Sequence, residues 1–162
     1  MGTAPGAAAI SFDWTFIVFV VLVIAMASSG AVFRPGDWYE GLRKPSWTPP
    51  NWLFGPVWSI LYIMIAVAGW LTWRAQPDSV AMWIWGAQLV LNGAWSWLFF
   101  GRRRMDLAFG EVCLMWLSIA AFIVAAYPVS IMASLLFVPY LIWVTIAATL
   151  NFSVWRLNTA RA

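Results

Sequence analysis

The sequence predicts an all-α membrane protein, a bundle in which five helices cross the bilayer. Hydrophobic residues make up 64% of its 162 residues and charged residues only 9%, which excludes an ordinary soluble domain. Uncharged segments of about one crossing each alternate with short loops that hold the charges. We therefore expect one membrane domain over residues 1–162, with no separate soluble part.

Five segments have the length and composition of membrane-spanning helices, and we expect them at about 13–33, 51–74, 80–101, 106–126 and 131–155. The first ten residues contain no lysine or arginine, so the first segment is expected to be a retained span rather than a signal peptide. The last two spans must be separated at Tyr127-Pro-Val-Ser130, because the uncharged segment around it is too long for one helix.

The basic residues predict an orientation. With five spans, the loop at 34–50, the arginine turn at 102–104 and the C-terminus share one side, which holds all the basic residues except Arg74. The positive-inside rule then places that side in the cytoplasm and the N-terminus outside, if the host is a bacterial inner membrane.

Several function classes are excluded by composition. There is no histidine and a single cysteine, Cys113, which excludes histidine-based catalysis, histidine ligation of haem, a disulfide framework and the usual zinc sites. No acidic cluster or phosphate-binding glycine loop occurs. We expect no metal site, no obligatory cofactor and no nucleic-acid partner, because the net charge of +3 reflects a few loops of a membrane protein.

The loop over residues 34–50 is rich in proline and aromatic residues. Prolines stiffen a chain and tryptophans favour burial, whereas a simple linker is polar and flexible. One interpretation is a lid or recognition element over a binding site. The alternative is an interfacial anchor, with aromatic rings at headgroup level and Arg43 and Lys44 on lipid phosphates.

The third predicted span carries two amides on an aromatic face. The residues that recur there at steps of three and four are Trp85, Gln88, Asn92, Trp95 and Phe99. An amide buried in a membrane must be hydrogen-bonded, so other helices or a ligand must satisfy this face.

Matching faces occur on two other spans: Trp58 and Tyr62 in the second, and Trp143 and Ala147 in the fifth. If the three faces converge, they form a pocket with stacking walls and two amides, which suits a large, flat, amphipathic ligand. The alternative is that these residues only pack helices against one another. Glu111, near the start of the fourth span, is expected to pair with the arginine turn; a proton-relay role is the alternative.

Four blocks of the sequence resemble the TspO/MBR family, the tryptophan-rich sensory proteins whose animal members are the translocator proteins or peripheral-type benzodiazepine receptors. They are WYEGLRKPSWTPPNW at 38–52, PVWSILY at 56–62, QLVLNGAWSWLFF at 88–100 and VPYLIWVTIAATLNFSVWRLN at 138–158. They occur in the order seen in that family and cover nearly the whole chain. The spacing of Lys44, Trp47 and the proline pair before Pro56-Val-Trp58 is its most specific part.

The resemblance implies a five-helix bundle, often a homodimer, that binds porphyrins such as protoporphyrin IX. Its function would be to sense, regulate or transport them, or to act as a small transporter of other amphipathic molecules. By motif, the family's pocket corresponds to Tyr39, Trp47, Pro49, Trp58, Tyr62, Gln88, Asn92, Trp95, Trp143, Ala147 and Leu150. We add Phe99 from the helical face described above.

The resemblance also raises two further activities. Some bacterial relatives are reported to promote light- and oxygen-dependent porphyrin breakdown, and Trp58 and Trp143 match the tryptophans implicated, so enzyme activity is an open alternative. Indole can donate an electron to a photoexcited ring. Sterol binding is expected to be weak, because Phe152 stands where the animal sterol motif has a tyrosine.

Overall fold

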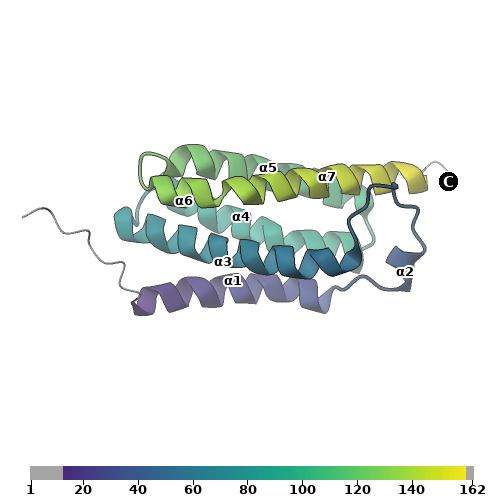
Figure 1. Cartoon of the computed structure of the whole chain (residues 1–162), viewed down its shortest axis with the longest axis horizontal. Coiled ribbons are helices and arrows are strands. Elements are labelled where there is room, and N and C mark those ends of the chain that lie inside the picture. Colours follow the sequence, from purple (N-terminus) through teal and green to yellow (C-terminus); the bar gives the residue numbers. More distant parts are fainter. Residues whose placement is uncertain (1–12, 160–162) are drawn as a thin grey trace, which may run out of the picture.

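The computed structural model describes residues 13–159, and over this range it contains helices and no strands. The helices are α1 (Trp14–Val32), α2 (Asp37–Glu40), α3 (Asn51–Ala75), α4 (Val80–Ser96), α5 (Met105–Ala126), α6 (Ile131–Leu136) and α7 (Val138–Thr159). The long helices lie side by side along one axis as a bundle (Figure 1). The short α2 and the end of α7 lie at the same end of it (Figure 1).

Four helical segments within residues 13–159 are long and apolar enough to cross a membrane: Trp14–Val32, Asn51–Ala75, Met105–Ala126 and Ile131–Thr159. They match the first, second, fourth and fifth predicted spans. The predicted third span is divided, because the 17-residue α4 continues directly into a five-residue π-helical turn, Trp97–Gly101. An all-helical bundle with membrane-spanning helices is therefore confirmed.

The predicted fifth span is interrupted between α6 and α7. Pro139 lies in the first turn of α7, where it has no N–H to donate and its ring crowds the preceding turn. Phe137 separates the two helices, yet the Leu141 amide still donates to its carbonyl at 2.9 Å, so α7 continues in nearly the same direction (Figure 1).

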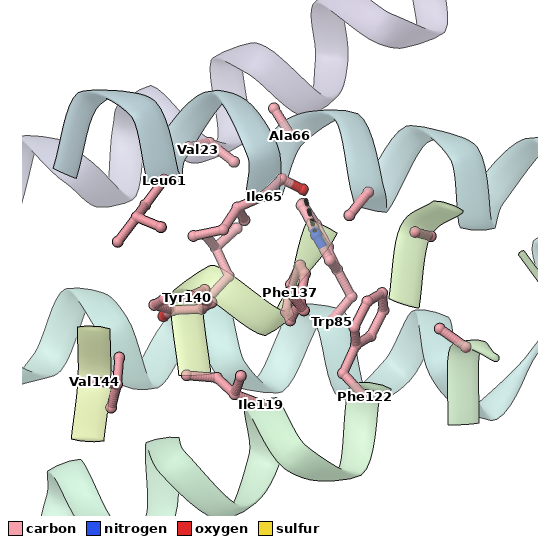
Figure 2. Packing of buried hydrophobic residues seen from close by; sticks show 14 of the residues in the cluster. Val23, Leu61, Ile65, Ala66, Trp85, Ile119, Phe122, Phe137, Tyr140 and Val144 are labelled. Atoms are coloured by element: carbon pink, nitrogen blue, oxygen red, sulfur yellow. Dashed lines mark hydrogen bonds between the residues drawn. The ribbon is translucent and has the colours of Figure 1, made fainter. Parts of the chain in front are cut away.

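The larger of the two clusters of buried apolar side chains is centred in the half of the bundle away from α2. The Trp85 indole of α4 donates a hydrogen bond to the Ile65 carbonyl of α3 at 2.9 Å (Figure 2). Phe122, Phe137 and Tyr140 fill the adjoining space (Figure 2). These side chains come from α3, α4, α5 and α7 and from the α6–α7 junction, so this half of the bundle is closed.

Helix α1 is held against the same half by aromatic contacts. Phe16 meets Trp70 edge-on at 5.4 Å between ring centroids, and Phe19 meets Trp85 at 5.1 Å. The Trp70 indole also donates to the Asp13 carboxylate at 3.3 Å. A hydrogen bond from Thr15 is the main cause that lowers the pKa of Asp13, which caps α1 as a carboxylate.

Close approach of α3 and α4 requires Gly69. A Cβ built there would lie 2.4 Å from Cε2 of Trp85, whose ring is fixed by its bond to Ile65. We predict that Gly69→Ala lowers the stability of the bundle by about 1–3 kcal/mol, through overpacking. The midpoint of thermal unfolding in detergent, followed by circular dichroism, measures this.

Gly86→Ala is the matched control for this prediction. It makes the same change within a helix, but a Cβ at Gly86 has no atom within 4 Å. It should leave the midpoint unchanged or raise it slightly. Equal midpoints for the two variants would show that the close contact between Gly69 and Trp85 does not determine the stability of the bundle.

Candidate ligand-binding cavity

A cavity of about 670 Å³ lies in the half of the bundle that ends at α2. Its walls come from the last turns of α1, the first turns of α3, the end of α4, the start of α5 and the last turns of α7. Pro35, Tyr39 and Glu40, in and around α2, close its end. Segments far apart in the sequence thus meet around one hollow.

Eight of the twelve predicted site residues lie on the cavity wall: Tyr39, Trp58, Tyr62, Asn92, Trp95, Phe99, Ala147 and Leu150. They come from the loop and from the second, third and fifth predicted spans, so the structure brings the three predicted faces together. Residues of α1 and α5 also line the cavity, including Gly30, Val112 and Met115, and these are not among the twelve predicted site residues. Small and aliphatic side chains give no chemical signal in a sequence this apolar.

The other four predicted residues do not line the cavity. Trp47 and Pro49 lie in the loop, and Trp47 remains 47% exposed. Gln88 is fully buried one turn beyond Asn92. Trp143 is also buried, with its ring edge-on to Phe54 at 5.5 Å, and it is Phe54 that reaches the cavity.

The two amides of α4 are joined by a phenol that the sequence analysis did not single out. Asn92 donates through Nδ2 to the Tyr140 hydroxyl at 2.7 Å, and that hydroxyl donates to Gln88 Oε1 at 3.2 Å. The Tyr62 hydroxyl lies 3.5 Å from Asn92 Oδ1. A signal was available, because Tyr140, Trp143 and Ala147 follow one another at steps of three and four.

Two stacked aromatic pairs form flat parts of the wall. Trp58 stacks on Tyr62 with centroids 5.3 Å apart and planes at 29°, both from α3. Trp95 stacks on Phe99 at 5.1 Å and 20°. The Trp95 indole donates to Asn151 Oδ1 at 3.2 Å, which fixes its ring. Such fixed faces suit stacking on a planar ligand.

The loop over the cavity is held by contacts on both sides. The Asn158 side chain of α7 accepts from the Arg43 N–H at 3.1 Å and donates to the Arg43 carbonyl at 3.0 Å. Tyr39 is buried against Phe99 and Phe100, with ring centroids 6.1 and 5.5 Å away. Burial raises the pKa of the Tyr39 phenol, so it stays neutral near pH 7.

Comparison with known proteins agrees with this architecture. The TspO/MBR family model matches residues 15–156. This chain belongs to the TspO/MBR family. It is 43% identical to protein CrtK of Rhodobacter capsulatus over 88% of this chain and 92% of that protein. It is 40% identical to the tryptophan-rich sensory protein of Cereibacter sphaeroides, over 93% and 96%. The human translocator protein is 42% identical over 80% and 81%.

Glu111 is a buried carboxyl group in this TspO/MBR chain. It is 8% exposed, and neither of its oxygens has a hydrogen-bond partner among the described residues. The predicted pairing with the arginine turn is wrong, because Arg104 binds Asp106 at 2.7 Å instead. Glu111 belongs to the inward face of α5, with Ala108, Val112 and Met115, and so points into the bundle interior.

The Tyr140 hydroxyl should stabilise the bundle. Tyr140→Phe removes the group that bonds both amides, leaving Asn92 Nδ2 and Gln88 Oε1 buried without that partner. We expect a loss of about 1–3 kcal/mol, seen as a lower midpoint of thermal unfolding.

Tyr127→Phe is the control for this loss, since Tyr127 is 60% exposed. Its midpoint should equal that of the wild type. An unchanged midpoint for Tyr140→Phe would mean that the amides are satisfied without the phenol.

Proposed function

We propose that this TspO/MBR protein binds flat, amphipathic tetrapyrroles, with protoporphyrin IX as the representative ligand, and serves to sense or regulate their level. The observation that supports this is the 670 Å³ cavity with two stacked aromatic pairs and Asn92 on its wall. Pockets for drug-sized ligands occupy roughly 300–1,000 Å³ and combine apolar walls with a few polar groups. This cavity has that size and composition.

The membrane arrangement is part of the proposal. Helix α4 and its π-helical turn together are long enough for a fifth crossing. Five crossings would place α2, the arginine turn and the C-terminus in the cytoplasm of a bacterium. The homodimer implied by the family resemblance would use an outward face, such as that of α4, where Val90 is 63% exposed.

The charges around the cap favour an acidic amphipath whose carboxylates point toward α2. Lys44 lies over the ring of Tyr39, with Nζ 4.4 Å from its centroid, and so brings a cation to the end of the cavity that α2 covers. Glu40 also lines this end and would repel a carboxylate placed next to it. The macrocycle would then occupy the apolar part, between the aromatic pairs.

Porphyrin titration tests the proposal. Protoporphyrin IX should quench the tryptophan fluorescence of the wild type at micromolar concentration and saturate. Trp58→Phe should raise the Kd by about 2- to 12-fold, because a stacked pair contributes about 0.5–1.5 kcal/mol. Asn92→Leu should also weaken binding, by removing the amide from the wall.

Trp83→Phe is the matched control, since Trp83 is 78% exposed on the outside of α4. Its Kd should equal that of the wild type. Absence of saturable quenching by the wild type would remove the proposal, and a thermal unfolding curve for each variant separates lost binding from lost folding.

The placement of Trp58 supports a second candidate, light- and oxygen-dependent porphyrin breakdown. Its indole lies on the cavity wall, stacked on Tyr62. Trp143 lies behind Phe54 and would act only through that ring or through a rearrangement.

Illumination of the bound complex in air measures this activity as loss of the porphyrin absorption band. We expect Trp58→Phe to slow the loss more than Trp143→Phe does, because a shorter path favours electron transfer from indole. Equal loss in both variants and in an unrelated membrane protein would exclude a role for the cavity.

A further inference from the structure

One side of the cavity wall is built from small residues that reach the protein surface. We call it the slot; Ala27, Gly30 and Ala31 of α1 face Asn51, Gly55 and Ser59 of α3 across it. All of these are exposed except Ala27, which is half-buried. A Cβ built on Gly55 would have no atom within 4 Å, so the slot is open at that point.

The same two helices are closed against each other farther along. There, ring contacts of Phe16 with Trp70 and of Phe19 with Trp73, and the hydrogen bond from Trp70 to Asp13, hold α1 to α3. Next to the slot, Met26 of α1 packs on Gly93 of α4 instead, where a Cβ would lie 2.8 Å from the Met26 methyl group. Beside the cavity, α1 therefore packs on α4 through Met26, while its small residues face α3 across open space.

The slot faces the region where lipid would lie. Ile24, one turn before Ala27 on α1, is 61% exposed, and Ile60, which follows Ser59 on α3, is 60% exposed. At its basic end, Arg34 donates through Nε to the carbonyl of Ala31 at 2.8 Å. Its guanidinium is thus held at the rim of the slot, with N–H groups left for a carboxylate.

At the end of the cavity under α2, the residues that cover it are held by several contacts. Tyr39 is buried there, and Asn158 holds Arg43 by two hydrogen bonds. Trp38 is fixed between Phe99, at 5.9 Å between centroids, and Arg103, whose guanidinium carbon is 5.8 Å from its ring. Opening the loop would break these contacts together, whereas no hydrogen bond or ring contact within residues 13–159 joins the two sides of the slot.

We propose that a flat, acidic amphipath dissolved in the bilayer enters this cavity sideways through the slot, and that Arg34 guides its carboxylate at the rim. The loop at 34–50 then covers the cavity as a fixed cap and is not the entry route. This inference rests on the proposed function, because it supplies the route to the same cavity. A planar ring can pass edge-first between backbones that carry only small side chains, with its carboxylate kept at headgroup level.

The first test blocks the slot. Wild type, Gly55→Phe and Gly110→Phe in phospholipid vesicles are mixed with vesicles loaded with protoporphyrin IX, and the rate of tryptophan quenching is measured by stopped flow. Gly110 is an exposed helical glycine on α5 with no atom near its Cβ, so it matches Gly55 away from the slot. Gly55→Phe should slow association by about 10-fold or more, and Gly110→Phe by less than about 2-fold.

The second test locks the cap. Arg43→Cys and Asn158→Cys, in a Cys113→Ala background, are joined by a short bis-maleimide, and the joined protein is compared with the unjoined one. A fixed cap predicts association rates within about 2-fold of each other. An association rate that falls by about 10-fold on joining, together with no effect of Gly55→Phe, would show that the ligand enters through the loop and would overturn the inference.

The third test addresses Arg34. Arg34→Gln should slow association of the diacid by about 3- to 10-fold while leaving its dimethyl ester unaffected, because only the diacid carries charge. Equal slowing of acid and ester would exclude guidance by charge. If quenching saturates at equilibrium but none of these rate effects occurs, entry through the slot is rejected and the proposed function stands. If the wild type shows no quenching, the proposed function itself is rejected.

Discussion

The need to satisfy two amides inside an apolar bundle governs how its helices meet. Gln88 and Asn92 lie one turn apart on α4, and both bond the hydroxyl of Tyr140. That hydroxyl also lies 3.5 Å from the sulfur of Met115 on α5. One phenol from α7 therefore fixes the relative positions of three helices, in surroundings where an unpaired amide is costly.

The Tyr140 contact also divides the bundle into two unlike halves. On one side of it, large rings such as Trp70, Trp85 and Phe122 fill the space, and Gly69 lets α3 and α4 approach closely. On the other side, α1 and α3 present small residues, and the helix ends diverge around the cavity. Fixed helices with a filled half and an unfilled half provide a preformed site, which lowers the entropic cost of binding a rigid ligand.

The proline-rich loop illustrates how local stiffness and tertiary contacts combine. Its sequence allowed both a lid and an interfacial anchor. In the structure Tyr39 closes the cavity and Lys44 lies over its ring, while Trp47 remains largely exposed. The loop thus covers the cavity through Tyr39 and Lys44, while its Trp47 lies off the cavity wall. The contacts from Asn158 and Arg103 make it a cap that is held in place, which is why the exposed slot becomes the simpler route to the cavity.

Membership of the TspO/MBR family and the cavity bear on different questions. The family match covers nearly all of the described chain and agrees with the sequence blocks. The lining of the cavity shows which residues a ligand could contact, because Trp58 lies on the wall and Trp143 does not. Sequence motifs treat the two tryptophans alike, so only their surroundings separate the roles proposed for them.

The sequence alone determined the helical segments, the basic end, the family and eight of the residues on the cavity wall. Length, hydrophobicity and helical periodicity are local properties, and the face shared by Asn92, Trp95 and Phe99 follows from them. Tertiary structure decided that Gln88 lies behind Asn92, that Tyr140 joins the amides, that Glu111 turns inward, and that α1 opens a slot beside α3. These outcomes depend on which helix faces which, and that is set by packing between segments far apart in the chain, which periodicity within one helix does not encode.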